Sequence, residues 1–227
     1  MDRKQAIGSA YHLTGGNNFY DGMITCSTLS GKAVCRLVWA MNKAENDDYL
    51  EKALSGIPEN FSGKLLEVPV GTGILTMPLY KTLPEAEITC LDYSADMMGR
   101  AQEKADRLHL KNVTFRQGDV VALPFTDGAF DIVLSLNGFH AFPDKEAAYR
   151  EVFRVLKPGG IFCGCFYVKG EQKRTDWFVR HIYEKTGFFT SPYETTVSLK
   201  KRLGKLYAAV TLGTVKSMAW FVCRKVE

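Results

Sequence analysis

The sequence predicts an α/β fold: a doubly wound, mostly parallel sheet of seven strands that ends in an antiparallel hairpin, preceded by a helical cap. From Lys64 onward, short apolar runs alternate with helix-like segments, which is typical of consecutive βαβ units. A Gly-rich turn at residues 71–73 joins the first of these runs to a helix. Near the C-terminus, two strand-like runs are separated only by a short turn at Gly213. They must pair antiparallel, because a parallel pair needs a longer crossover.

The composition is that of one globular domain of 227 residues, 46% hydrophobic and 24% charged. A net charge of +4 is far from the basic footprint of a nucleic-acid binder. No apolar run reaches the length of a membrane span, and the polar residues 1–5 do not begin a secretory signal, so we expect a cytoplasmic protein. The six cysteines have neither C-x-x-C nor zinc spacing, so we expect reduced, buried thiols and no metal.

Residues 1–62 are expected to form a helical cap within the same domain as residues 63–227. The strands are predicted at 65–69, 87–92, 113–117, 130–136, 161–168, 206–212 and 216–224. The helices between them are predicted at 74–83, 95–108, 144–156, 176–185 and 193–203. Residues 130–136 carry consecutive apolar or small side chains, as a strand buried on both faces should. Residues 157–160, Lys-Pro-Gly-Gly, are expected to end the preceding helix.

Acidic residues follow the strands where ligands bind in open α/β sheets, beyond the carboxyl ends of the strands. Asp92 ends the second predicted strand, about one βα unit after the Gly-rich turn, where a carboxylate accepts hydrogen bonds from ribose hydroxyls. Asp119 follows the third strand and is placed to accept from the exocyclic amine of adenine. Together the two acids predict an adenosine site.

The glycine spacing indicates which adenosine compound binds. A nicotinamide dinucleotide requires G-x-G-x-x-G, but here Gly71 and Gly73 are followed by Thr76 in place of the third glycine. Glu67, at the end of the first strand, would also repel a pyrophosphate. An acid at this position suits a ligand with an amino group and a sulfonium, which points to S-adenosylmethionine.

At these residues the chain resembles class I S-adenosylmethionine-dependent methyltransferases, most closely the ubiquinone/menaquinone biosynthesis branch. The resemblance covers about 64–168 and the terminal hairpin, and it implies a Rossmann-like fold. Four segments carry it in order: 67–73 (EVPVGTG), 92–98 (DYSADMM), 118–125 (GDVVALPF) and 156–160 (LKPGG). The first departs from the family pattern at Pro69, where a glycine usually stands; proline fixes φ and lacks an N–H.

The resemblance also implies the cofactor contacts. The glycines would meet the methionine moiety, Glu67 its amino end, Asp92 the ribose and Asp119 the adenine amine. The remaining residues would pack on the adenine or face the sulfonium and its methyl group. The full implied set is Glu67, Gly71, Gly73, Asp92, Tyr93, Met97, Asp119, Val120, Leu136 and Asn137.

Methyl transfer from a sulfonium is an in-line displacement that depends mainly on alignment, and a base is needed only if the acceptor must lose a proton. His140, after the fourth strand, and Tyr20 in the cap are the catalytic candidates, with Tyr11 and Asp21 beside the latter. The alternative for His140 is a backbone-bonded histidine that shapes the pocket wall; the alternative for Tyr20 is packing within the cap.

Residues 137–140, Asn-Gly-Phe-His, replace the N-P-P-Y-type motif of many amine methyltransferases. Together with the aromatic residues near the expected mouth, this favours a small, partly apolar acceptor and O- or C-methylation. Two alternatives stay open: a methyltransferase acting on RNA or protein, and a non-catalytic S-adenosylmethionine-binding regulator. The basic run at 200–205 is expected to be a solvated helix face.

Overall fold

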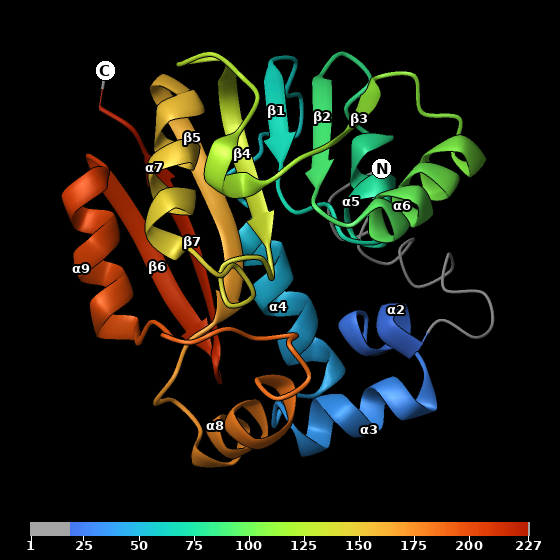
Figure 1. Ribbon diagram of the computed structural model, residues 1–227. Coiled ribbons are helices and arrows are strands. Elements are labelled where there is room, and N and C mark those ends of the chain that lie inside the picture. Colours follow the sequence, from blue (N-terminus) through green and yellow to red (C-terminus); the bar gives the residue numbers. More distant parts are fainter. Residues whose placement is uncertain (1–18, 227) are drawn as a thin grey trace.

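A computed structural model describes residues 19–226 of the chain, with side chains from Asp21 onward. Its centre is a seven-stranded sheet in the order β3-β2-β1-β4-β5-β7-β6 (Figure 1). The strands are β1 (Lys64–Glu67), β2 (Glu87–Asp92), β3 (Val113–Gln117), β4 (Phe130–Leu136), β5 (Leu156–Tyr167), β6 (Ala209–Val215) and β7 (Met218–Arg224). All neighbours pair parallel except β7, which is antiparallel to both β5 and β6. The predicted fold class is therefore confirmed.

Helices cover both faces of this sheet (Figure 1). One face packs against α4 (Lys43–Leu54), α5 (Thr76–Tyr80) and α6 (Ala95–Arg107). The other packs against α7 (Lys145–Val155), α9 (Thr196–Leu206) and the short 3₁₀ helix η1 (Val120–Ala122). Alternate residues of the strands enter the two apolar layers, so that Leu65 lies in one layer and Leu66 in the other.

Four short helical segments lie beyond the carboxyl ends of the parallel strands, at the bottom of Figure 1. They are α2 (Phe19–Ile24), α3 (Leu29–Leu37), α8 (Lys173–Phe178) and the π-helical η2 (Val179–Tyr183). The cap therefore combines segments from both ends of the chain, whereas α4, expected within the cap, packs on β5 and β7. Within residues 19–226, no helix is both long and apolar enough to cross a membrane.

Several boundaries differ from the sequence prediction, and two of these differences have a clear structural reason. The terminal hairpin turns at Lys216 and Ser217, not at Gly213, which pairs with Trp220 inside the sheet. A Cβ at Gly213 would lie 2.7 Å from the Trp220 ring, so this glycine makes room for the indole. Strand β5 begins at Leu156 rather than Ile161, because the Lys-Pro-Gly-Gly segment joins the ladder through an irregular register beside β4.

The cysteines also differ from expectation, because Cys26 and Cys35 form a disulfide between the end of α2 and α3. The prediction that all thiols are reduced is therefore wrong for this pair. The remaining four, Cys90, Cys163, Cys165 and Cys223, are free and buried, as predicted. The disulfide escaped the sequence analysis because its spacing matches no redox or metal motif, and only the α2–α3 corner brings the two residues together.

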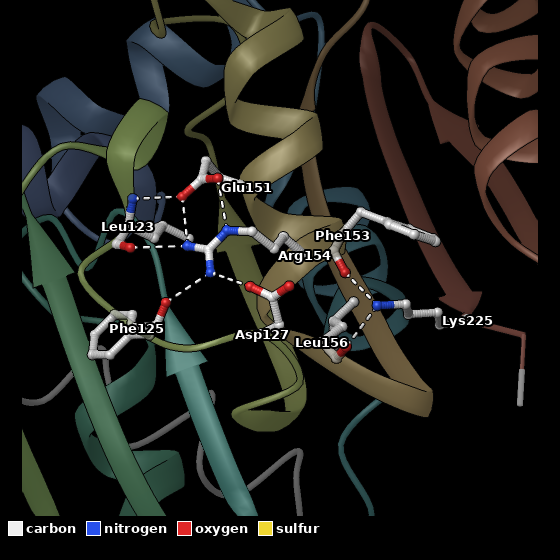
Figure 2. Close-up of polar contacts among 8 residues, drawn as sticks. All are labelled: Leu123, Phe125, Asp127, Glu151, Phe153, Arg154, Leu156 and Lys225. Atoms are coloured by element: carbon white, nitrogen blue, oxygen red, sulfur yellow. Dashed lines mark hydrogen bonds and ion pairs between the residues drawn. The ribbon is translucent and has the colours of Figure 1, made fainter.

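A partly buried arginine fixes the loop between η1 and β4, which continues from one of the predicted cofactor segments (Figure 2). The Arg154 guanidinium, on α7, donates to the backbone carbonyls of Leu123 and Phe125 and to the carboxylates of Asp127 and Glu151. Glu151 in turn accepts from the Leu123 N–H at 2.8 Å. Because these bonds satisfy backbone groups that no strand or helix pairs, they hold the loop against α7.

We expect Arg154→Ala to lower the free energy of unfolding by about 2 kcal/mol, because charge-assisted bonds to two carbonyls and two carboxylates are lost. Arg150→Ala, one turn away and exposed on the same helix, is the matched control and should change it by less than about 0.5 kcal/mol. Urea denaturation measures both. Equal effects of the two substitutions would show that the loop does not depend on Arg154.

Candidate active site

A cavity of about 760 Å³ lies between the carboxyl ends of the strands and the cap. A smaller cavity of about 70 Å³ adjoins it at the glycine turn, and Ile24, Pro69, Gly71 and Asn137 line both. The larger volume is toward the upper end of the range for small-molecule sites. It can therefore hold a cofactor and a second ligand side by side.

The Gly-rich turn forms the floor between the two cavities. Gly71 and Gly73 both have left-handed φ angles, +56° and +65°, which explains why glycine stands at these positions. A Cβ on Gly71 would meet nothing within 4 Å, so its backbone faces open cavity. A Cβ on Gly73 would instead crowd Ala101 and Met77 at 3.0 Å, so this glycine allows the turn to approach α5 and α6. The preceding Val68–Pro69 peptide is cis.

Asp92 joins the end of β2 to this turn. One carboxylate oxygen accepts from the Gly71 N–H at 2.8 Å, and the other accepts from the Ser94 N–H at 2.9 Å. Burial raises the pKa of Asp92, although the backbone hydrogen bonds oppose that shift. Each carboxylate oxygen can accept a second hydrogen bond, and Asp92 lines the large cavity. Asp92 can therefore hold the turn and accept hydrogen bonds from a ligand at the same time.

Glu67 lies under the turn, beside the smaller cavity, and is almost fully buried. Its Oε2 accepts from the Tyr80 hydroxyl at 2.8 Å. Burial raises the pKa of Glu67 to about 8, which outweighs the hydrogen bonds that favour the carboxylate. Without a cation nearby, the side chain is therefore mostly protonated at neutral pH.

A third acid reaches the turn, from the cap. Asp21, on α2, accepts from the Thr72 hydroxyl at 2.5 Å and forms an ion pair with Lys104 of α6 at 3.0 Å. Both charged side chains are buried, with 1% and 3% of their surfaces exposed. Sequence analysis singled out Asp21 but missed Lys104, because a lysine among the charged residues of α6 resembles a solvated face. The ion pair attaches the cap to the cofactor-side helix.

His140 lines the large cavity with its ring stacked on Phe189, at 3.9 Å between centroids. Its Nδ1 accepts from the Tyr167 backbone N–H at 3.1 Å, which places the proton of the neutral ring on Nε2. Burial, with a smaller contribution from the Lys145 ammonium, lowers the pKa of His140 to about 3. The ring has no free lone pair for a substrate proton, so this geometry matches the pocket-wall role rather than that of a general base.

The remaining predicted residues gather around the same space. Tyr93, Met97, Asp119 and Val120 line the large cavity, Leu136 lines the small one, and Asn137 lines both. Asp119 is exposed and accepts from the Val121 N–H at 3.1 Å, and Asn137 has a left-handed φ of +57°. Tyr11 and the Tyr20 side chain lie outside the described residues.

The part of the cavity beneath the cap is apolar and largely aromatic. Its lining residues from the cap and from the end of the sheet include Val34, Trp39, Met41, Phe142, Tyr183, Phe189 and Met218. The Trp39 ring stacks on Tyr183 and lies 6.1 Å from Phe189. The cavity therefore has a polar side at the strand ends and an apolar side below the cap.

Residues 65–160 match a family described as a methyltransferase domain. They form a class I, S-adenosylmethionine-dependent methyltransferase domain. S-adenosylmethionine is the methyl donor of this class, and the acids and open glycine backbone described above fit its charged and hydroxyl groups. The polar side of the cavity is accordingly the expected cofactor side of the domain.

Curated relatives place the domain near the quinone-biosynthesis branch. A demethylmenaquinone methyltransferase of Thermus thermophilus is 42% identical over 97 residues, 43% of this chain and 44% of the relative. A chloroplastic 2-methyl-6-phytyl-1,4-hydroquinone methyltransferase of rice is 32% identical over 157 residues, 68% of this chain and 42% of the relative. The chain thus spans less than half the length of these curated relatives.

A solved S-adenosylmethionine-dependent methyltransferase from Aquifex aeolicus has a similar fold, with a TM-score of 0.59 at 18% identity. The match covers 85% of this chain and 93% of the solved chain. At this identity the similarity concerns the fold alone.

The buried acid predicts a specific pH dependence for Glu67→Gln. Between about pH 4.5 and pH 8, unfolded Glu67 has released its proton whereas the native side chain has kept it. Rising pH therefore favours unfolding of the wild-type protein in this window, by up to about 1.4 kcal/mol per pH unit. The stability of the wild type relative to Glu67→Gln should fall accordingly, as measured by urea denaturation from pH 4.5 to pH 8. A constant difference would contradict the raised pKa.

The Asp21–Lys104 pair predicts a large coupling energy. Lys104→Met alone should cost about 3 kcal/mol, because it leaves a buried charge unpaired, and adding Asp21→Asn should recover much of that loss. The exposed Asp48–Lys52 pair, on α4, is the control, with an expected coupling below about 0.5 kcal/mol. Double-mutant cycles by denaturation measure both, and equal coupling energies would contradict a role for burial.

Proposed function

We propose that this protein transfers a methyl group from S-adenosylmethionine to a small, partly apolar acceptor, by O- or C-methylation. The observation that carries the proposal is the two-sided cavity, whose polar side has the acids and open backbone for a cofactor and whose apolar side has room for an acceptor. The relatives act on demethylmenaquinone and on a phytyl hydroquinone, which supports a ring-bearing, apolar acceptor. Residues 1–62 would belong to one domain with the cofactor-binding residues 63–227, and the part of 1–62 that precedes α4 would act as the cap together with α8 and η2.

In the proposed complex, each acid on the cofactor side has a separate task. Asp92 binds the ribose hydroxyls while it holds the turn, and Asp119 binds the adenine amine. Glu67 lies nearest the ammonium group, and a positive charge there favours its carboxylate form. Cofactor binding would then release a proton from Glu67 near neutral pH. Asn137, between the two cavities, would face the transferable methyl group.

The apolar side restricts the chemistry of the acceptor. His140 offers only its Nε2–H, so it can donate a hydrogen bond to an acceptor oxygen but cannot remove a proton. Catalysis would rest on in-line alignment and exclusion of water. This favours an acceptor that ionises readily, such as a phenol or hydroquinone. Tyr20 stays a candidate for contact with the cofactor or acceptor.

We also propose that the protein acts in the cytoplasm and has no nucleic-acid partner. The four free, buried cysteines support this location, whereas the Cys26–Cys35 disulfide points to an oxidising compartment. The mild net charge supports this partner class. Cell fractionation followed by immunodetection tests the location, and a nuclease-treated purification that still retains bound RNA would contradict the partner class.

The function is tested by a panel of phenols, hydroquinones and polar amines, scored by release of S-adenosylhomocysteine. The proposal expects turnover with at least one apolar hydroxylated ring and none with the amines or with RNA. Binding of the cofactor without turnover on any acceptor would instead favour the regulatory alternative.

Asp92→Asn should weaken binding of S-adenosylmethionine about 10- to 100-fold, because an amide cannot accept from two backbone N–H groups and from a ribose as the carboxylate can. Asp96→Asn is the control, since it removes the same charge from an exposed acid nearby. Calorimetry should show its affinity within about twofold of the wild type. Unchanged affinity in Asp92→Asn would remove the ribose assignment.

A further inference from the structure

The outer side of the cap exposes an unusual number of large apolar side chains. Within residues 21–226, eight such side chains are exposed, and five of them belong to α3, α8, η2 and the loop that follows. They are Leu29 (89% exposed), Leu37 (58%), Trp177 (54%), Ile182 (43%) and Phe188 (59%). We refer to these five residues and the cations around them as the cap surface. Concentrated exposed apolar area of this kind marks an interaction site.

Six cations share the cap surface. They are Lys32, Arg36, Lys173, Arg174, Arg180 and Lys185, all exposed. None of the six forms an ion pair with another residue in the described part of the chain, and α3 contains no acid. Asp176, the acid within α8, already accepts from the Tyr167 hydroxyl and the Gly170 N–H. Glu184, directly after η2, is half-buried, so the six exposed cations outnumber the acids and the cap surface is both apolar and positive in net charge.

The elements that carry the cap surface are joined to one another. The Arg174 guanidinium donates to the Arg36 carbonyl at 2.8 Å, and the Thr175 hydroxyl donates to the Val38 carbonyl at 2.7 Å. These bonds connect the start of α8 to the end of α3. Figure 1 shows both helices together at the bottom of the molecule, beyond the carboxyl ends of the parallel strands.

The cap surface is continuous with the apolar side of the cavity. Phe188 is more than half exposed and also lines the cavity, so its side chain stands where the cavity meets the surface. Val34 of α3 and Tyr183 of η2 line the cavity from the same elements. A molecule entering past Phe188 would pass from the cap surface directly into apolar surroundings.

We propose that the cap surface docks on an anionic lipid bilayer, with its apolar side chains in the interfacial region and its cations against the lipid headgroups. Mixed apolar and basic surfaces bind such interfaces through both forces. A second copy of this chain fits less well, because a two-fold contact would place the same positive surface on both sides of the interface. Docking would present the cavity mouth to the bilayer; this last step alone rests on the proposed apolar acceptor.

The charge contribution is tested by flotation of the full chain with vesicles of equimolar phosphatidylglycerol and phosphatidylcholine. Lys32→Glu, Arg180→Glu and Lys185→Glu combined should weaken binding roughly 100-fold or more, since each cation contributes about fivefold. The control is Lys200→Glu, Lys201→Glu and Lys205→Glu combined, the same charge change on exposed residues of α9. The control should bind like the wild type, and binding of the wild type should decrease with added salt.

The apolar contribution is tested by tryptophan fluorescence with brominated lipids in the same vesicles. Trp177 is the most exposed of the three tryptophans, so its emission should be quenched on binding, and Trp177→Phe should float with the vesicles but lose that quenching. Absence of flotation at low salt would overturn the proposal. So would an equal loss in the α9 control, or a dimer in sedimentation velocity that the cap-surface variant abolishes.

Discussion

The turn at residues 69–73 depends on side chains that come from other elements. Its own sequence supplies left-handed glycines and a proline, but few hydrogen bonds that would fix its path. Asp92 holds the Gly71 N–H from the end of β2, and Asp21 holds the Thr72 hydroxyl from the cap. The turn is thus fixed by one carboxylate within the sheet and another outside it. A change in the cap that moves Asp21 would therefore also alter the turn.

Three acids surround this one turn, and each avoids the cost of a buried negative charge in a different way. Asp92 accepts two backbone N–H groups, Asp21 pairs with Lys104, and Glu67 keeps its proton. Of the three acids, only Glu67 can still become charged. A cationic ligand group beside Glu67 would compensate the negative charge of its carboxylate. The side chain would therefore be neutral without the ligand and ionised when it binds one.

The sequence predicted the parts of the fold that follow from local pattern. Strands β2, β3 and β4 begin and end where they were predicted, because each is an apolar run bounded by polar or turn residues. The predicted cofactor residues also line adjoining cavities, since carboxyl ends of parallel strands share one edge. The predictions that failed concern features that depend on contacts between different elements of the fold. They are the Cys26–Cys35 disulfide, the burial of Lys104 and the position of Gly213, which lies in the sheet and leaves room for the Trp220 ring instead of forming a turn. None of these has a local signature.

The histidine after β4 shows why a residue type alone does not assign a role. His140 stands where a base would be useful, but the Tyr167 N–H occupies Nδ1 and the surroundings keep the ring neutral. Under the proposed function, a site in which His140 cannot act as a base would favour acceptors that ionise readily. The apolar wall of the cavity continues past Phe188 to the basic cap surface, so the proposed docking would also favour acceptors held in a bilayer. An acidic ring with an apolar tail would meet both conditions, whereas a polar metabolite in water would meet neither.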